Sequence, residues 1–205
     1  MTTIKVDKVI PKTGTSIALG DSGDTFTIPA GTTFENLGTA TGFGSAGIVG
    51  VKTKPFLGSS SKTGSNFNEW TEFQLTYTAA STSNRLLFMW QIVHASASAT
   101  STIFKFYNNT ASADIAGAIG DADGSRPRCT GRGHNNSTSW GATHYLQAWV
   151  TPINTSANQY TIQAWNHNNA TMRINSNSNN ADADTADNSR GLSQFTVIEF
   201  GSGIL

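Results

Sequence analysis

Alternation of apolar and polar residues is the most frequent pattern along this chain. It is clearest over residues 73–77, 146–150 and 160–164. Successive side chains of a β-strand point to opposite faces of the sheet, so each segment predicts a strand with one face turned to a core. No window of 11 or more residues keeps the i, i+3, i+4, i+7 spacing of an amphipathic helix, and the poor helix formers Thr, Ser, Asn and Gly are abundant. The chain is therefore predicted to be all-β.

The run Leu-Leu-Phe-Met-Trp-Gln-Ile-Val at residues 86–93 does not alternate. A strand without a polar face must be covered on both sides, and a neighbouring subunit around a symmetry axis can cover the side that faces away from the opposing sheet. The alternative is one buried strand in a larger monomeric sandwich. The nearly continuous apolar segment 195–200 predicts a second central strand. The candidate subunit contacts are Leu86, Phe88, Trp90, Ile92 and Phe200.

The first 45 residues differ in composition from the rest of the chain. Short β-prone pieces at 3–9, 16–19 and 25–28 are separated by turn residues and contain too little apolar material to bury a core of their own. This pattern favours a short β-rich anchor or shaft, ordered by sister chains or by a docking partner, over a flexible tail. Glycines between residues 38 and 47 mark a hinge. The predicted division is therefore an anchor over 1–45 and a sandwich domain over 46–205.

The charge balance, the lengths of the apolar runs and the cysteine content exclude several classes of function. Lys+Arg and Asp+Glu both number 13, so no long-range field favours nucleic acid or an anionic membrane. The longest apolar run, 86–90, is far shorter than the roughly 20 residues that span a bilayer, and the N-terminus has no apolar signal segment, so we expect synthesis in the cytoplasm without secretion or membrane insertion. The single Cys129 cannot form an intrachain disulfide and is expected to be a buried free thiol.

No catalytic motif is present. The sequence lacks GxSxG, HExxH, GxxxxGK[ST] and CxxC, and it contains only four glutamates. A depolymerase that cleaves polysaccharide needs paired carboxylates and is therefore disfavoured. Acidic residues at 121 and 123 and at 182, 184 and 187 are more typical of solvated turns than of a calcium site. We expect no enzymatic activity, no cofactor and no metal.

Aromatic, histidine and asparagine residues cluster in the polar loops of the second half. Aromatic rings stack on pyranose rings and side-chain amides bond hydroxyls, so these residues suggest a carbohydrate contact. The alternative is that Trp165 covers the rim of the core and that the asparagines solvate turns. The candidate receptor-binding residues are His134, Asn135, Trp140, Trp165, His167 and Asn168.

The order of several motifs resembles the C-terminal domain of tail-fibre-like structural proteins of marine and cyanobacterial phages. The resemblance rests most on IGDADGSR at 119–126 and RGLSQFTVIEF at 190–200, and the opening TIKVDKVIPKTGTSIALGDSGDTFTIPAG is similar to the N-terminal segments of the same proteins. It also includes IVGVKTK at 48–54, WTEFQLTYT at 70–78, SNRLLFM at 83–89 and YTIQ at 160–163.

The resemblance implies a jelly-roll-type antiparallel sandwich, similar to complement-type and tumour-necrosis-factor-like heads, that assembles as a homotrimer. It implies a virion structural protein, a short tail fibre or adhesin. Residues 1–45 would join other virion proteins, and the head would contact host surface polysaccharide or an outer-surface protein. Because the shaft is very short, a capsid decoration protein or a head or collar fibre is the alternative. By the same resemblance, the motif loop is expected to be structural, with Arg126 forming hydrogen bonds to carbonyls or pairing with an acidic partner. The residues of this motif loop are Gly120, Asp121, Gly124, Ser125 and Arg126.

Overall fold

A computed structural model of the chain describes residues 47–98, 100–134, 141–177 and 190–202. The chain divides into two units, Met1–Phe43 and Gly44–Leu205, and every described residue belongs to the second. The predicted anchor over 1–45 thus lies outside the described residues. The described residues form eleven strands, all paired antiparallel, and contain no helix that could cross a membrane. The all-β prediction is confirmed.

The first sheet is built around β4. On one side β4 pairs with β11 and, further along, with β10, and on the other side it pairs with β8. β11 lies between β1 and β4, which confirms the predicted central position of residues 195–200. The strands of this sheet are β1 (Ile48–Phe56), β2 (Ser60–Lys62), β4 (Arg85–Ser96), β8 (Ala142–Val150), β10 (Met172–Ile174) and β11 (Ser193–Phe200).

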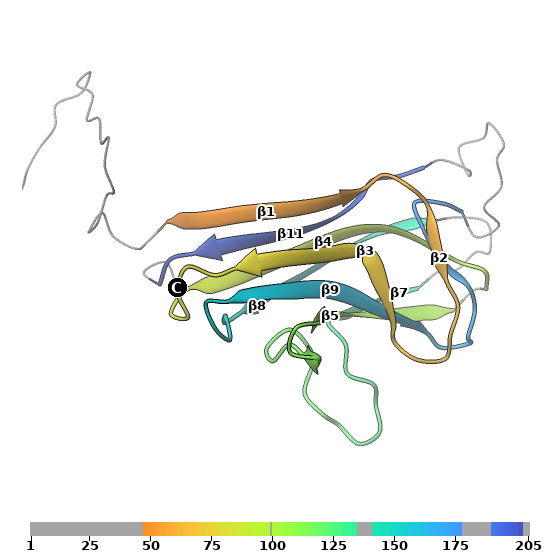
Figure 1. Ribbon diagram of the computed structural model, residues 1–205. Coiled ribbons are helices and arrows are strands. Elements are labelled where there is room, and N and C mark those ends of the chain that lie inside the picture. The colour runs from red at the N-terminus through yellow and green to blue at the C-terminus, as the bar shows by residue number, and fades with distance from the viewer. Residues whose placement is uncertain (1–46, 99, 135–140, 178–189, 203–205) are drawn as a thin grey trace, which may run out of the picture. The chain divides into compact units, whose positions relative to one another are not determined.

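The second sheet is built around β5, which pairs with β9 along one edge and with β6 and β7 at different positions. β3 closes this sheet by pairing with β9. Figure 1 shows the two sheets as stacked layers. The strands are β3 (Asn68–Thr78), β5 (Ser101–Asn108), β6 (Ala113–Asp114), β7 (Gly131–His134) and β9 (Ala157–Asn166).

Aromatic rings from both sheets form the core between the layers. Phe88 of β4 makes edge contacts with Phe106, Tyr160 and Phe195, with ring centroids 5.5, 4.8 and 5.5 Å away. Trp90, two residues along β4, contacts Phe104 of the second sheet at 5.3 Å. Such pairs add about 0.5–1.5 kcal/mol each beyond the area they bury, so the pairs that join β4 to β5 and β9 hold the sheets face to face. The inward positions predicted from alternation are buried: Phe73, Leu75, Tyr77, Ala148, Val150, Tyr160, Ile162 and Ala164, with Leu146 partly buried.

Four of the five candidate subunit contacts are instead core residues. Leu86, Phe88, Trp90 and Ile92 are at most 1% exposed within a single chain, so the prediction that they contact another subunit is wrong. β4 alternates like an ordinary strand, but apolar residues also occupy its outward positions, which hid the alternation in the sequence. Phe200 is half-buried at the end of β11 and contacts Trp149 at 5.3 Å, and its role in a subunit contact stays a prediction.

The motif loop between β6 and β7 is held by local contacts. Arg126 forms an ion pair with Asp123, an acidic partner of the kind expected. Arg128 Nε donates to the Gly120 carbonyl at 2.6 Å, and Gly124 has the positive φ of 58° that favours glycine. Cys129 is half-buried rather than fully buried, and this burial raises the pKa of its thiol. The loop therefore contains a tight turn at Asp123–Arg126, and its residues 120–128 are exposed beside the second sheet.

Candidate ligand-binding site

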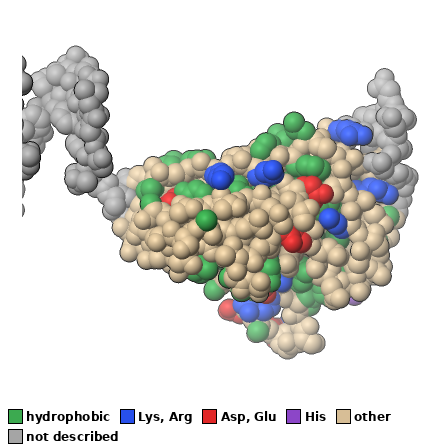
Figure 2. All heavy atoms as spheres, in the orientation of Figure 1, with side chains coloured by type: hydrophobic (Ala, Val, Ile, Leu, Met, Phe, Trp, Pro, Cys, Tyr) green, Lys and Arg blue, Asp and Glu red, His purple; other side chains and the backbone are tan. Residues whose placement is uncertain are grey.

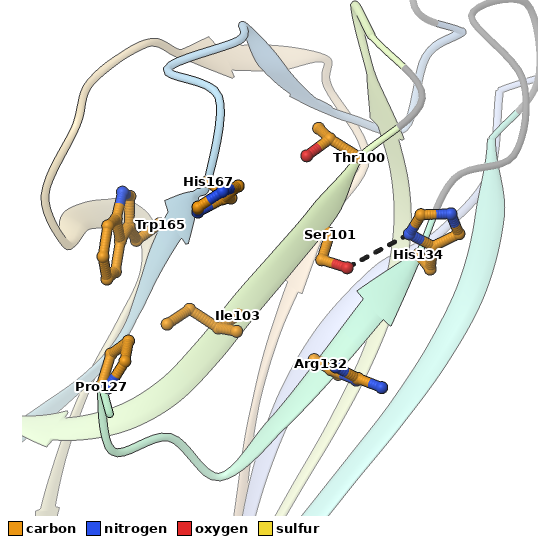
Figure 3. A pocket seen from close by; sticks show the side chains of 8 residues that line it. All are labelled: Thr100, Ser101, Ile103, Pro127, Arg132, His134, Trp165 and His167. Atoms are coloured by element: carbon orange, nitrogen blue, oxygen red, sulfur yellow. Dashed lines mark hydrogen bonds between the residues drawn. The ribbon is translucent and has the colours of Figure 1, made fainter. Parts of the chain in front are cut away.

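An open pocket lies on the outer face of the second sheet, over β5, β7 and β9 (Figure 3). Its volume is about 410 Å³, which lies within the range of small-molecule sites. The side chains that line it are Thr100, Ser101, Ile103, Pro127, Arg132, His134, Trp165 and His167.

Strand register explains how these side chains meet. Ile103 pairs with Trp165 on one side and with Arg132 on the other, so the three form one row across β9, β5 and β7. The next row places Ser101 beside His134, and the Ser101 hydroxyl lies 3.1 Å from His134 Nδ1. Positions i and i+2 of a strand share a face, so β5 and β7 each contribute two side chains to the pocket, and β9 contributes Trp165.

His167 completes the second row at the end of β9. Its backbone N–H donates to the Ser101 carbonyl at 3.2 Å. The chain continues into a turn in which the Asn168 N–H donates to Asn166 Oδ1 at 3.1 Å. In Figure 3 the rings of Trp165 and His167 stand on one side of the β5 ribbon, and Arg132 and His134 stand on the other.

Three candidate receptor-binding residues are brought together in this pocket: His134, Trp165 and His167. Asn168 is not a lining residue, and Asn135 and Trp140 lie outside the described residues. Sequence reasoning missed the other five lining residues. The available signal was the i, i+2 spacing of Arg132 with His134, but it becomes informative only when β7 is known to pair with β5.

Trp165 forms the aromatic wall of the pocket and is supported from behind. Phe67 contacts it edge-on with ring centroids 6.0 Å apart, and Lys105 Nζ lies 4.2 Å from the centroid of the Phe67 ring. Lys105 is itself paired with Asp114 at 2.5 Å. This chain of contacts fixes the Trp165 ring in place.

A buried polar network lies beneath the pocket and fixes the strands that form it. Asn166, between Trp165 and His167 in the chain, donates from Nδ2 to the hydroxyls of Ser96 and Thr102, both at 3.1 Å. Thr102, between Ser101 and Ile103, also lies 3.2 Å from His94 Nε2. Since alternate residues point to opposite faces, the inward hydrogen bonds of these strands position their outward pocket residues.

Two histidines lie close together on the core side of this region. His94 is fully buried, and its ring centroid is 5.7 Å from that of His144. Burial, and secondarily the neighbouring His144, lowers the pKa of His94 to about 3. Burial also lowers the pKa of His144. A Cβ atom on Gly133 would lie 2.5 Å from the His144 ring, so a glycine is needed where β7 passes this pair.

Because of this histidine pair, we expect the folded protein to lose stability in mild acid. Because the pKa of folded His94 lies below its ordinary value, the unfolded chain binds the extra proton as the pH falls below about 6.5. We expect the free energy of unfolding to fall by about 2–3 kcal/mol between pH 7.5 and pH 4.5 through this group. Urea unfolding at both pH values measures it. The loss should shrink in His94→Gln and persist in the pocket variant His167→Gln; an equal loss in all three proteins would contradict the assignment.

Among the described residues, no group of three or more His, Cys, Asp or Glu side chains could hold a metal ion. The pocket lining contains no carboxylate. Its arrangement of an aromatic wall, hydroxyls and basic side chains is suited to holding a polar ligand by stacking and hydrogen bonding. No protein-family model and no curated protein sequence matches this chain.

Proposed function

We propose that this chain is a non-enzymatic structural protein of a bacteriophage virion, a short trimeric tail fibre or adhesin whose sandwich domain attaches the particle to the host cell surface. One observation carries the proposal. The two outer faces of the sandwich differ in character: on the first sheet, a partly apolar face without charge at the positions paired with Leu87 through Gln91 suits sister chains, and an aromatic and polar pocket on the second suits a surface ligand. Residues 1–45 would join the domain to the particle.

The order of the eight longest pairing strands supports a jelly-roll-type head. The first sheet pairs β1-β11-β4-β8 and the second pairs β3-β9-β5-β7. Lettered A to H along the chain, these strands give the orders A-H-C-F and B-G-D-E. Non-consecutive neighbours of this kind result from the two Greek keys of a jelly roll.

The outer face of the first sheet carries a continuous apolar row. Leu87 of β4 pairs with Ile198 of β11 and Trp149 of β8, and Ile198 pairs with Val51 of β1. Val51 and Trp149 are 57% and 38% exposed in the single chain, and Met89 beside this row is 41% exposed. We call the four residues Val51, Ile198, Leu87 and Trp149 the outer apolar row. Figure 2 shows hydrophobic side chains along the margin where β1 runs.

Further copies of the same chain fit this face better than an unrelated partner does. A rotation axis brings identical residues of sister chains close together, so a charged residue there would repel its own copy. The outward positions paired with Leu87 through Gln91 are Val51, Thr53, Pro55, Gln194, Thr196, Ile198, Tyr145, Gln147 and Trp149, and none is charged. Apolar side chains exposed over four adjacent strands are typical of an interaction surface.

The pocket supports attachment through several weak contacts. In a trimer, three pockets lie on the faces away from the shared interface, because the pocket and the outer apolar row belong to opposite outer faces of the sandwich. Linking weak sites raises the overall avidity without a tight single contact. A modest pocket of this size is therefore sufficient for stable adhesion.

The carboxylates of the described residues do not favour polysaccharide cleavage. Glycoside hydrolysis needs two carboxyl groups about 5–10 Å apart and facing the same bond. Glu199 is buried and accepts hydrogen bonds from Tyr77 and Asn84, and Asp114 is paired with Lys105. None of these groups lines the pocket. The proposal is therefore an adhesin without a reaction.

A cell-binding assay tests the proposed function. Labelled full-length protein is titrated onto a panel of marine cyanobacteria and other marine bacteria, and we expect saturable binding to at least one strain. Trp165→Ala should weaken this binding at least tenfold, because the stacking surface is lost; base–aromatic stacking of comparable area is worth about 1–3 kcal/mol.

Tyr107→Ala is the matched control, because Tyr107 lies on β5 of the same sheet but outside the pocket. It should leave binding unchanged. Absence of binding to every strain, together with immunogold labelling of the capsid rather than the tail, would contradict attachment and support the decoration protein.

A further inference from the structure

We infer that the pocket over β5, β7 and β9 binds a saccharide that carries a carboxylate, with the sugar ring on Trp165 and the carboxylate on Arg132. This inference rests on the proposed attachment function and specifies its ligand. Three of the eight lining residues, Arg132, His134 and His167, have basic side chains, and none is acidic. Although the formal net charge of the whole chain is zero, basic side chains are concentrated around this pocket.

Arg132 is free to bind a ligand. Its side chain is exposed on β7, and within the described ranges it has no carboxylate partner. Two other basic residues near this face are already neutralised: Lys105 by Asp114, and Arg126 by Asp123. A guanidinium presents a planar pair of donors that matches a carboxylate, and such charge-assisted hydrogen bonds are about twice as strong as neutral ones.

The spacing of the row fits one ligand that touches both ends. Trp165, Ile103 and Arg132 lie on three adjacent strands in register, so the backbones of Trp165 and Arg132 are about 10 Å apart, two strand spacings. Ile103 forms an apolar floor between them. A ring stacked on Trp165 therefore has its edge toward β7, where the long Arg132 side chain can reach a substituent.

The remaining lining groups favour a sugar with one negative charge. Thr100, Ser101 and His134 supply hydroxyl and imidazole groups that can bond ring hydroxyls. Arg132 is the one lining side chain that is always charged, and it balances the one charge of a carboxylate better than the about 1.5–2 negative charges of a phosphate. A uronic-acid-type sugar combines the single charge with the apolar ring face that Trp165 needs.

The test uses full-length protein and two probes, a galacturonic acid trimer and its methyl ester, titrated by isothermal calorimetry and by saturation-transfer NMR at low salt. Methyl esterification removes the charge and keeps the ring, and we expect it to weaken binding at least tenfold. Arg132→Gln should remove this preference, so that acid and ester bind alike. Trp165→Ala should weaken both probes.

Arg85→Gln is the matched control, since Arg85 is an exposed arginine at the start of β4 in the other sheet. It should retain the preference for the acid. Equal binding of acid and ester by the unmodified protein, or an unchanged preference in Arg132→Gln, would overturn the inference. If cells still bind the protein in that case, the proposed attachment function is retained and its ligand is neutral. If the unmodified protein does not bind cells, the proposed function itself is rejected.

Discussion

Replacing Glu199 with alanine is expected to lower the free energy of unfolding by about 3–5 kcal/mol. Glu199 is 1% exposed, and its carboxylate accepts hydrogen bonds from the Tyr77 hydroxyl at 2.9 Å, the Ala80 N–H at 2.9 Å and Asn84 Nδ2 at 2.7 Å. Its removal leaves three donors without their partner at the end of the sandwich. The donors of Tyr77 and Asn84 are buried, and a buried donor without a partner costs about 1–3 kcal/mol, so these two losses, with a smaller one at the part-buried Ala80 N–H, account for the expected total.

Urea unfolding at pH 7 measures this change. The free energy of unfolding should fall less in Glu199→Gln. The glutamine side-chain carbonyl can still accept a hydrogen bond, whereas its NH2 group faces donors and cannot bond them. Glu72→Ala is the matched control, since Glu72 is only half-buried and bonds the Ser60 hydroxyl, and it should cost no more than about 1 kcal/mol. Equal losses for the Glu199→Ala and Glu72→Ala variants would show that the buried network contributes little.

This network connects the two sheets. Glu199 lies on β11 of the first sheet, Tyr77 lies on β3 of the second, and Ala80 and Asn84 lie in the connection from β3 to β4. Burial, and secondarily the hydrogen bond to Glu199, raises the pKa of the Tyr77 hydroxyl. Tyr77 is therefore a neutral donor at physiological pH, as the buried carboxylate requires.

The sequence contained a signal for this role. Residues 195, 197 and 199 fall on one face of the predicted strand, and Phe195 and Val197 are core residues. Alternation therefore places Glu199 in the core as well. What alternation does not provide is the set of partners, because Tyr77 and Asn84 reach Glu199 only after strands that are far apart in sequence have paired.

The segment 86–93 likewise shows a strand that the sequence predicts and a pairing that it does not predict. Its strand character was predictable, but eight nearly continuous apolar residues do not reveal which four face inward. The inward residues meet the second sheet within one chain, and the outward ones form part of the outer face. Cover for the outer side by a neighbouring subunit stays a prediction, and the residues on that side could not be chosen from the sequence without knowing the register.

The pocket shows what residue types alone can reveal. Trp165, His134 and His167 were grouped because aromatic and imidazole side chains suit a polar ligand, and the fold places all three around one cavity. Ile103 and Arg132 were missed because they join the site through cross-strand pairing of β5 with β9 and β7. Residues whose types suggest no binding role, such as Ile103, thus enter the site only because strand pairing places them beside the aromatic and histidine residues that the sequence had indicated.

Replacing Leu87 with glutamate is expected to convert the proposed trimer into monomers. Leu87 lies in the middle of the outer apolar row, between Ile198 and Trp149. In a trimer the substitution buries an unpaired charge in each of three chains, and each buried charge costs about 3–5 kcal/mol. Sedimentation equilibrium of the full-length protein should show a mass of about 65 kDa, three times the 21.7 kDa chain, falling to that of one chain.

The control separates loss of assembly from loss of folding. Leu57→Glu makes the same chemical change at a residue that is 75% exposed and follows β1, outside the outer apolar row, and it should remain trimeric. The Leu87→Glu monomer should keep its β circular dichroism, because the core side of β4 is unchanged. It should also bind cells more weakly than the trimer while binding a soluble saccharide equally well, since the pocket is intact and only the multivalency is lost. An unmodified protein that sediments as one chain would remove the assembly role of this face, and attachment would then depend on single pockets.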